Sequence, residues 1–447
     1  MQDKTVDLIV KGGLVWLDGN WVEDIAIAIN RGQIVDLGAT DRIVQRYVAT
    51  DVLEAQGKFV IPGLVDAHTH LSQQLLRGYT IEQIPMIWAR ILIPYESVLS
   101  PEDVYVSAQL GCLEMIKAGI IGFADAGGPF PEAICAAAEE MGLYATVAPS
   151  YMDQGDFIPD NMKLSPDEIA KKFQTFYHKW NAKAAGRIRC FIGLRQIMTV
   201  SRELARTLIK LAADYNTGIH LHLAEHKDEV LFSLTHYGCR PVAWLEGMGF
   251  FDFHVLAAHC VLLTSVEIRK LVEHKVNIVH CPVANLTSHG FPKVAEIKAL
   301  GGRVALGSDG ASGSPLDLFE AARILYVATR GYYGLPVFDS SPLPVTELLG
   351  MMTLASSLAA GITKTGSIKV GNSADLVLID YESPHLVPLA RPEFSFPMFV
   401  RASDVTDVIV MGKILMRNRE VKVIDEIKLY EHARKKQKEI FSRARLS

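Results

Sequence analysis

The sequence predicts an α/β protein: a (β/α)8 TIM barrel with a small discontinuous β-sandwich domain formed by both chain ends. Through the middle of the chain, continuous apolar runs alternate with helical stretches, as expected for parallel strands that are buried on both faces. Several of these runs end in histidine or aspartate. Active-site residues of such barrels gather at the carboxyl ends of the strands, so the two observations support each other.

The barrel prediction depends on eight candidate strands separated by helices. The expected strands are 59–67, 119–127, 142–150, 188–195, 218–224, 254–260, 276–281 and 303–308. Between them, 201–215 carries leucines near helical spacing, and 265–274 follows a Leu-Thr-Ser capping signal. This order of elements is typical of repeated βα units.

Both ends of the chain are rich in short strands. Residues 6–58 and 369–425 contain brief apolar runs separated by turn residues. The last twenty or so residues are rich in Lys, Arg and Glu, with Leu429, Ala433 and Ile440 interspersed, and predict a surface helix. The expected division is 1–58 for the first part of the small β domain, 59–367 for the barrel, and 368–447 for the second part of the small β domain plus the C-terminal helix.

Composition narrows the class of protein. The 447 residues are 49% hydrophobic and 21% charged, which supplies a sizeable core. A formal net charge of −5 gives no reason to expect a nucleic-acid partner. No apolar run has the length of a membrane span, and we expect no membrane partner and no signal peptide. Six scattered cysteines favour a reducing cytoplasm, and we expect a homo-oligomer that acts on a small molecule.

The first chemical motif is the pair His68 and His70. An apolar strand ends in Ile-Pro-Gly-Leu-Val-Asp-Ala-His-Thr-His, and residues two apart in a strand point to the same face. Both imidazoles can therefore reach one cation. Two solvated histidines at a strand end are the alternative, because two ligands alone do not define a metal site.

Four further strand ends carry similar residues. Singly, each is more often an ordinary polar residue at a strand end than a ligand. Together they favour one shared site: they are His220 and His222 with Glu225 just beyond, His259, His280 and Asp309. His220 and His222 have the same parity, so spacing alone does not show which of them binds metal.

These motifs resemble a known family. Pro-Gly-Leu-Val-Asp-Ala-His-Thr-His, His-Leu-Ala-Glu, Ala-Ala-His-Cys, His-Cys-Pro-Val-Ala-Asn and Gly-Ser-Asp-Gly occur in the order of the amidohydrolase superfamily. More narrowly, the chain resembles the group of S-adenosylhomocysteine and methylthioadenosine deaminases and atrazine chlorohydrolase. The resemblance extends over nearly the whole chain.

The resemblance implies roles for particular residues. His68, His70, His222 and Asp309 would hold the metal, with His220 as a neighbour. Glu225 would be the proton shuttle, His259 would lie beside the hydrolytic water, and Asp309 would take the water's proton. The chemistry is consistent, because a divalent cation lowers the pKa of bound water toward ~7 and a placed carboxylate can protonate a ring nitrogen.

The fourth expected strand limits the number of metal ions. Binuclear members of the superfamily use a carboxylated lysine there, and 188–196 contains no lysine. We therefore expect one divalent metal. Three imidazoles and a carboxylate indicate Zn2+, although Fe2+, Mn2+ or Co2+ also suit this ligand set.

Four other residues are candidates for substrate binding: Trp88, Glu96, Arg195 and His280. Arg195 replaces a histidine that contacts substrate in adenosine-type deaminases, and its planar donor fork suits a carbonyl or anionic group. An internal salt bridge to a carboxylate is the alternative. Glu96 matches a glutamate that binds ribose hydroxyls and Trp88 could form a stacking wall, but a helix cap and a core aromatic are equally ordinary explanations.

The expected function is hydrolysis. A metal-bound hydroxide would attack an amidine-like carbon of a purine, pterin, pyrimidine or triazine, and ammonia would leave. Hydrolytic dechlorination, or cleavage of an amide, urea or carbamate, is the alternative within the superfamily. A non-enzymatic assembly protein on the same fold is a further alternative, against which the complete set of ligands and proton-transfer residues argues.

Overall fold

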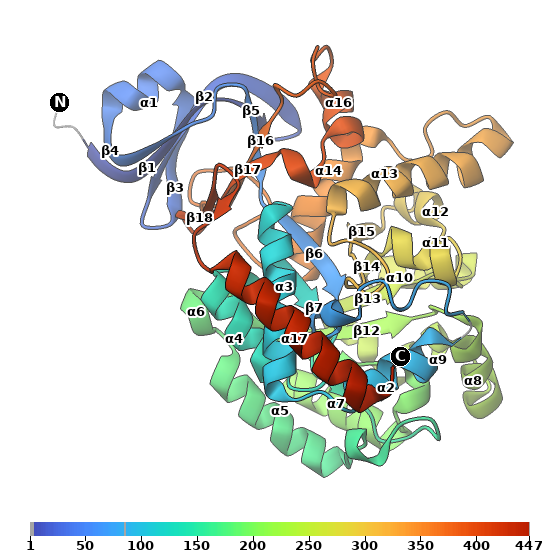
Figure 1. Ribbon diagram of the computed structural model, residues 1–447. Helices are drawn as coiled ribbons and strands as arrows, with labels where there is room; N and C mark the ends of the chain where they lie inside the picture. Colours follow the sequence, from blue (N-terminus) through green and yellow to red (C-terminus); the bar gives the residue numbers. More distant parts are fainter. Residues whose placement is uncertain (1–3, 85, 447) are drawn as a thin grey trace.

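The computed structural model describes residues 4–84 and 86–446. Figure 1 shows parallel strands enclosed by helices, with a second sheet at one side that is built from strands of the N-terminal and C-terminal regions. The predicted α/β class with parallel sheets is therefore confirmed. Among the described residues, no helix is long and apolar enough to cross a membrane.

The central strands follow one another along the chain and pair in parallel. One sheet has the order β10-β8-β7-β6 and the other has the order β15-β14-β13-β12-β11-β9. Their bounds are β6 Leu64–Thr69, β7 Ile120–Asp125, β8 Tyr144–Val147, β9 Ser150–Tyr151, β10 Ile188–Cys190, β11 Ile192–Leu194, β12 Ile219–Leu223, β13 Val255–His259, β14 Asn277–His280 and β15 Arg303–Leu306. Most of these strands are buried along their whole length, as their unbroken apolar sequences predicted.

Three expected strands are interrupted. The run 59–67 divides at Gly63 into β5 (Lys58–Pro62), which joins the other sheet, and β6. A side chain at Gly63 would lie 2.4 Å from Ile121 Cγ1, so only glycine allows this close passage. The runs 142–150 and 188–195 each divide into two short strands, where Pro149 O comes within 2.1 Å of the Cβ position of Gly193.

Both ends of the chain meet in one nine-stranded sheet with the order β19-β18-β17-β16-β5-β1-β2-β3, to which β4 is added beside β1. Its other strands are β1 Lys4–Leu17, β2 Asn20–Asn30, β3 Gln33–Ala39, β4 Tyr47–Glu54, β16 Leu376–Asp380, β17 Val405–Val410, β18 Lys413–Arg417 and β19 Glu420–Val421. The hydrogen bonding is continuous, in contrast to the two stacked sheets that a sandwich implies. Around Gly12 and Gly13, β1 changes partner from β4 to β5.

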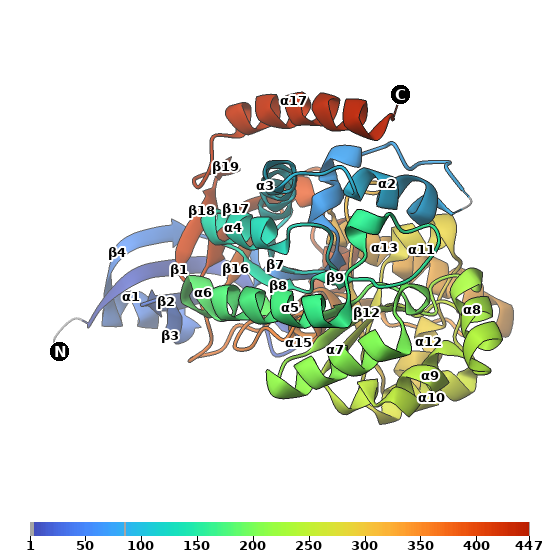
Figure 2. The same cartoon turned by 90° about the horizontal axis from the view of Figure 1, so that it is seen from below.

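The helices surround the parallel strands (Figures 1 and 2). Longer helices are α3 Pro101–Lys117, α4 Pro131–Met141, α5 Pro166–Trp180, α7 Arg202–Asp214, α8 Lys227–Tyr237, α9 Pro241–Met248, α10 Ser265–Glu273, α13 Leu318–Thr329, α16 Pro392–Phe399 and α17 Glu426–Ala444. Shorter helices are α1 Thr40–Arg46, α2 Ile93–Glu96, α6 Lys183–Gly186, α11 Pro282–Ser288, α12 Val294–Ala299, α14 Leu348–Gly350 and α15 Ser356–Ala359. The predicted helices are confirmed as α7 and α10, and Thr264 and Glu267 cap α10 reciprocally.

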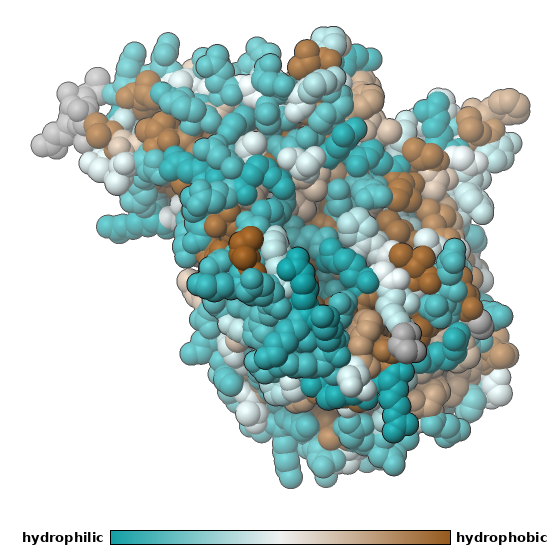
Figure 3. Space-filling view, in the orientation of Figure 1, coloured by the Kyte–Doolittle hydropathy of each residue, from teal (hydrophilic) through white to brown (hydrophobic). Residues whose placement is uncertain are grey.

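The predicted C-terminal helix, α17, lies against α3 (Figures 1 and 2). Leu429, Ala433 and Ile440 are buried on its inner face, as the spacing of these apolar residues suggested. Its outward surface is mainly hydrophilic in Figure 3. The C-terminal helix therefore attaches the end of the chain to the helical layer.

Candidate active site

Four metal-ligating side chains meet at the carboxyl ends of three parallel strands. His68 lies in β6 with His70 directly after it, His222 lies in β12, and Asp309 follows β15. The ligand atoms of this group all lie within 4.8 Å of one another. His68 Nε2 is 3.1 Å from Asp309 Oδ1, and His70 Nε2 is 3.3 Å from His222 Nε2. The four side chains that the sequence proposed as ligands therefore converge on one point.

The protonation of His70 fits a cation. A carbonyl oxygen can only accept, so the 3.3 Å contact from His70 Nδ1 to Gly127 O requires hydrogen on Nδ1 and leaves a lone pair on Nε2. Burial, reinforced by Arg195, lowers the pKa of His70 to about 3, and burial lowers the pKa of His222 well below its usual value. Neutral imidazole is the form that binds metal, so the group fits a divalent cation with three nitrogen ligands and one oxygen ligand.

His220 shares a strand and a face with His222 but contacts a different atom. Its Nε2 lies 2.8 Å from His68 Nδ1, whereas His68 Nε2 faces Asp309. A hydrogen on His68 Nδ1 that is donated to His220 leaves Nε2 free for a cation. The contacts thus separate two histidines that spacing could not, because His220 orients a ligand and His222 faces the other ligands.

Two further groups that the sequence singled out lie beside the ligands. Glu225 Oε1 is 3.8 Å from His259 Nε2, which in turn is 4.0 Å from Asp309 Oδ1. Burial raises the pKa of Glu225, but His259, His289 and His222 outweigh it and hold that pKa well below the usual range. Burial likewise raises the pKa of Asp309, yet His259, His68 and His70 lower it to about 2. Both carboxylates are therefore ionised acceptors.

The buried side chain of Asn285, in α11, fixes the orientation of His259. The backbone N–H of Cys281 donates to Asn285 Oδ1 at 3.2 Å, so the amide nitrogen must lie on the other side, 2.9 Å from His259 Nδ1. Because Asn285 Nδ2 donates, His259 Nδ1 accepts. The hydrogen of neutral His259 is then on Nε2, which points toward Glu225 and Asp309.

Strained backbone marks the same strand ends. Ala224, His259, Cys260 and Asp309 have φ values of +48°, +72°, +52° and +64°. Residues with side chains rarely adopt this left-handed region, and such strain concentrates at functional sites. Hydrogen bonds hold the conformation, among them one from Asp309 N to His68 O at 2.9 Å.

Three buried carboxylates tie down the loops that carry the site. Asp66 accepts from the backbone N–H groups of His68 and Ser308, and Asp125 accepts from those of Leu71 and Gly127. Glu229, in α8, accepts from Ala224 and Glu225 at 2.9 Å each. These side chains face backbone amides, so they position the loops.

A pocket of about 880 Å³ opens onto this group. Polar residues lie toward the ligands, and apolar residues form much of the remaining wall. The lining includes His70, Gln73, Arg195, Gln196, His222, Glu225, His289 and Asp309, together with Ile84, Ile87, Trp88, Leu92, Met198 and Leu262. This volume accommodates a small heterocycle with a substituent.

Arg195 and Glu96 are paired with each other. Arg195 Nη1 and Nη2 donate to Glu96 Oε2 and Oε1 at 3.0 and 3.1 Å, and both side chains are almost completely buried. Gln73 Nε2 donates to Glu96 Oε1 at 2.7 Å. The internal salt bridge that was the alternative for Arg195 is therefore present, and Arg195 also borders the pocket.

The other two candidates for substrate binding differ in position. Trp88 lines the pocket and contacts Phe157 edge-on, with ring centroids 5.0 Å apart. His280 is fully buried, donates from Nδ1 to Asn285 Oδ1 at 2.9 Å and packs against Phe291. Of the residues that the structure describes, those lining the pocket include neither Glu96 nor His280.

Sequence reasoning did not single out several residues of the site. Gln73, Gln196 and His289 line the pocket, and Asn285 lies behind it. Gln73 is three residues after His70, and Gln196 directly follows Arg195, so position relative to a candidate was an available signal. His289 carried no such signal, because it lies beyond the motif that contains His280.

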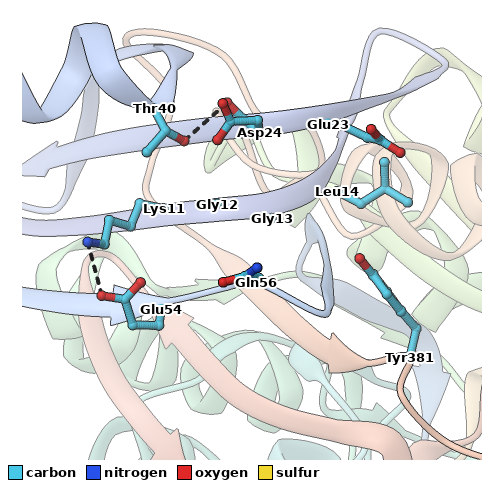
Figure 4. A pocket seen from close by; sticks show the side chains of 10 residues that line it. All are labelled: Lys11, Gly12, Gly13, Leu14, Glu23, Asp24, Thr40, Glu54, Gln56 and Tyr381. Atoms are coloured by element: carbon cyan, nitrogen blue, oxygen red, sulfur yellow. Dashed lines mark hydrogen bonds and ion pairs between the residues drawn. The ribbon is translucent and has the colours of Figure 1, made fainter.

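A second hollow, of about 500 Å³, lies in the nine-stranded sheet (Figure 4). Lys11, Glu23, Asp24, Glu54 and Gln56 are among its lining residues, and Lys11 pairs with Glu54 at 3.1 Å. Among the described residues, the only grouped set of possible metal ligands is the one at the strand ends. The chemistry of the protein therefore centres on the larger pocket.

Four ligands at the ends of parallel strands, with a carboxylate and an imidazole beside them, define a metal-dependent hydrolase. The amidohydrolase family model matches residues 59–415. The chain is 35% identical over 419 residues to a 5-methylthioadenosine/S-adenosylhomocysteine deaminase of Pelotomaculum thermopropionicum, covering 92% of this chain and 93% of that protein. The chain belongs to the amidohydrolase family.

Solved structures agree with this assignment. An adenosine deaminase from Xanthomonas campestris with bound zinc superposes with a TM-score of 0.92 at 28% identity, covering 98% of this chain and 100% of that one. Atrazine chlorohydrolase TrzN from Arthrobacter aurescens TC1 superposes with a TM-score of 0.86 at 23% identity, covering 96% and 100%. The second likeness is one of fold. The family resemblance recognised in the sequence is thereby confirmed.

Proposed function

We propose that this protein is a metal-dependent aminohydrolase that removes ammonia from an amidine-like carbon of a nitrogen heterocycle. The placement of Glu225 and His259 beside the ligand group, which includes Asp309, carries the proposal. A divalent cation, when bound by His68, His70, His222 and Asp309, supplies hydroxide at neutral pH by lowering the pKa of water.

The chain's own residues then move protons. Asp309, ionised and in contact with His68, accepts a proton of the attacking water. Glu225 is ionised at rest, so it first takes one proton of the water and then delivers it to the ring nitrogen next to the attacked carbon, while the Nε2–H of His259 donates to the developing oxygen. Asp309 passes the other proton of the water to the amino group, which leaves the tetrahedral carbon as ammonia and completes the hydrolysis.

We propose zinc as the metal, one ion per chain. Three imidazoles and a carboxylate are suited to zinc, and the similar Xanthomonas structure contains it. Iron, manganese and cobalt accept the same ligands and are the alternatives.

The substrate proposal concerns Arg195. Arg195 donates two of its guanidinium N–H groups to Glu96, so its remaining N–H groups are available to a ligand in the pocket. Glu96 is occupied by this salt bridge and is not among the residues that line the pocket. A planar substrate with a carbonyl or anionic acceptor fits these donors better than an unmodified adenosine, whose ribose diol would need the Glu96 carboxylate. The deaminase relatives are named for adenosine derivatives, so this proposal separates the chain from them.

A kinetic panel tests the role of Arg195. Arg195→Ala should raise KM for the acceptor-bearing substrate strongly and leave metal content unchanged, but it also leaves Glu96 buried and unpaired, at a cost of about 3–5 kcal/mol. The Glu96→Gln/Arg195→Gln double variant removes both charges and serves as the control for stability. Efficient deamination of plain adenosine derivatives, with unchanged KM in the variants, would make Arg195 a structural residue.

A screen tests the function itself. Zinc-loaded protein is incubated with purines, pterins, pyrimidines, triazines and ureas, and ammonia, amine and chloride are measured. Release of ammonia from a heterocycle supports the proposal, whereas chloride release or urea cleavage would indicate the other hydrolytic chemistries of the family. Loss of all activity despite bound metal would favour a non-enzymatic assembly protein.

The architecture around the site is also proposed. We infer that β6 to β15 close into one (β/α)8 barrel, supported by the hydrogen bond from Asp309 N to His68 O between the first and last strands. The divisions 1–58, 59–367 and 368–447 remain our domain proposal.

We propose a cytoplasmic homo-oligomer without nucleic-acid partners. The free cysteines support the cytoplasm, the net charge of −5 argues against nucleic acid, and the exposed apolar residues Leu335, Val337 and Phe338 support contact with a second copy of the chain.

A further inference from the structure

His289 holds the carboxylate of Glu225 from the pocket side. His289 Nε2 lies 3.1 Å from Glu225 Oε1, and Gln196 Nε2 lies 2.6 Å from Glu225 Oε2. Since a carboxylate oxygen only accepts, His289 Nε2 carries the hydrogen. Each oxygen of Glu225 therefore has one side-chain donor, which leaves its other lone pairs for the reacting atoms.

The two donors come from separate segments of the chain. Gln196 follows the short strand β11, whereas His289 lies at the end of α11. The backbone N–H of His289 donates to Asn285 O at 2.8 Å, so the His289 ring is anchored to the residue that orients His259. The segment that follows β14 thus contacts His259 through Asn285 and Glu225 through His289, and it supplies no metal ligand.

The surroundings of His289 are those of a functional group. Its side chain is 23% exposed and borders the same pocket as Glu225. Burial lowers its pKa, but the hydrogen bond to Glu225 and the charges of Glu225 and Asp309 outweigh this and raise it. Its ring faces His226 at 6.0 Å and His259 at 6.3 Å.

We propose that His289 is a positioning residue for the proton shuttle: it holds Glu225 by a hydrogen bond so that the carboxylate exchanges its proton with the substrate ring. This inference rests on the proposed function of Glu225. The bond keeps Oε1 toward His259 and favours the ionised carboxylate until a proton arrives.

Two substitutions separate hydrogen bonding from packing. His289→Phe keeps an aromatic ring but cannot donate, and His289→Gln keeps a donor of similar reach. We expect His289→Phe to retain metal and lower kcat at least tenfold with a smaller change in KM, and His289→Gln to restore kcat to within about threefold of wild type. His236→Phe is the matched control, because His236 is exposed on α8, where its Nδ1 contacts Phe232 O and its ring stacks on the Phe232 ring, and it is not among the residues that line the pocket.

The effect of His289 on Glu225 can be measured even without a known substrate. Infrared difference spectra between the metal-loaded protein and its Glu225→Gln variant report the titration of the Glu225 carboxyl. We expect that titration to move to higher pH in His289→Phe and to return toward wild type in His289→Gln. Unchanged titration together with unchanged kcat in His289→Phe, or equal losses in both variants, would overturn the proposal. If no compound is hydrolysed but the titration moves as expected, the function fails and the positioning of Glu225 stands.

Discussion

At Glu225, side chains from three separate segments meet around one carboxylate. Gln196 and His289 donate to its oxygens, and His259 lies 3.8 Å away. The nearby imidazoles hold its pKa well below the usual range, although burial acts in the opposite direction. The group is thus poised to accept a proton and pass it on.

Replacing this carboxylate tests its role. Glu225→Gln should bind the metal as the wild type does, because Glu225 is outside the ligand group, and lose at least ~10²-fold in kcat, the usual scale for a positioned acid or base. Metal analysis and steady-state kinetics on the same preparation check both parts. Near-normal kcat would show that another residue moves the proton.

Asn285 gives a second prediction at this scale. Asn285→Leu removes the donor to His259 Nδ1 at similar volume, so the hydrogen of His259 is no longer restricted to Nε2. We expect kcat to fall roughly 5- to 100-fold, the equivalent of about 1–3 kcal/mol for an unsatisfied buried group. Nitrogen-15 spectra of His259 report the tautomer directly.

Asn277→Leu is the control for that change. Asn277 is also buried in β14 and donates to Val255 O at 3.1 Å, so its loss removes a comparable bond away from the pocket. It should lower stability and leave kcat unchanged. A drop in kcat as large as that of Asn285→Leu would point to general disruption of the strand.

At the scale of elements, the sequence revealed more about strands than about the loops after them. Unbroken apolar runs located the parallel strands, and the residues ending them supplied His68, His222 and Asp309. Pro62 and Gly63 indicated a turn, but 59–67 was predicted as one strand; its division between two sheets depends on the passage of Ile121 from a distant strand. The sequence also left open whether Arg195 contacts substrate or forms an internal salt bridge. Its partner Glu96 lies about a hundred positions earlier in the chain, so their contact depends on the fold.

The loop that carries Glu225 depends on α8 through Glu229. Burial raises the pKa of Glu229 to about 8, above the usual ~4.3. Between these pH values the folded protein retains a proton that the unfolded chain has lost, so this contribution to stability is full below about pH 4.3 and is lost as the pH rises through 8. The wild-type Tm should therefore fall between pH 5 and 8 more steeply than that of Glu229→Gln.

Calorimetric scans at several pH values test this dependence. For one group, the free energy of unfolding changes by at most about 1.4 kcal/mol per pH unit. Glu203→Gln is the control, because Glu203 is exposed on α7 and its curve should parallel the wild type. Parallel curves for Glu229→Gln and wild type would mean that Glu229 is ionised throughout the range.

At the scale of the whole molecule, strands from the N-terminal and C-terminal regions pair in one sheet. Strands from 4–62 and 376–421 share one sheet, and a separate cluster of buried side chains, including Leu8, Ile27 and Leu376, packs on it. The sequence predicted the shared β region but not the single sheet, because the change of partner at Gly12 and Gly13 depends on register.

The proposed reaction requires one metal ion held by His68, His70, His222 and Asp309. Metal content, measured on purified wild type and on the His68→Ala, His70→Ala and His222→Ala variants, tests it most directly. We expect one divalent ion per chain in the wild type and a sharp loss of metal, with loss of activity, in each variant, because each removes one of four ligands. Stoichiometric metal in all three variants would contradict it.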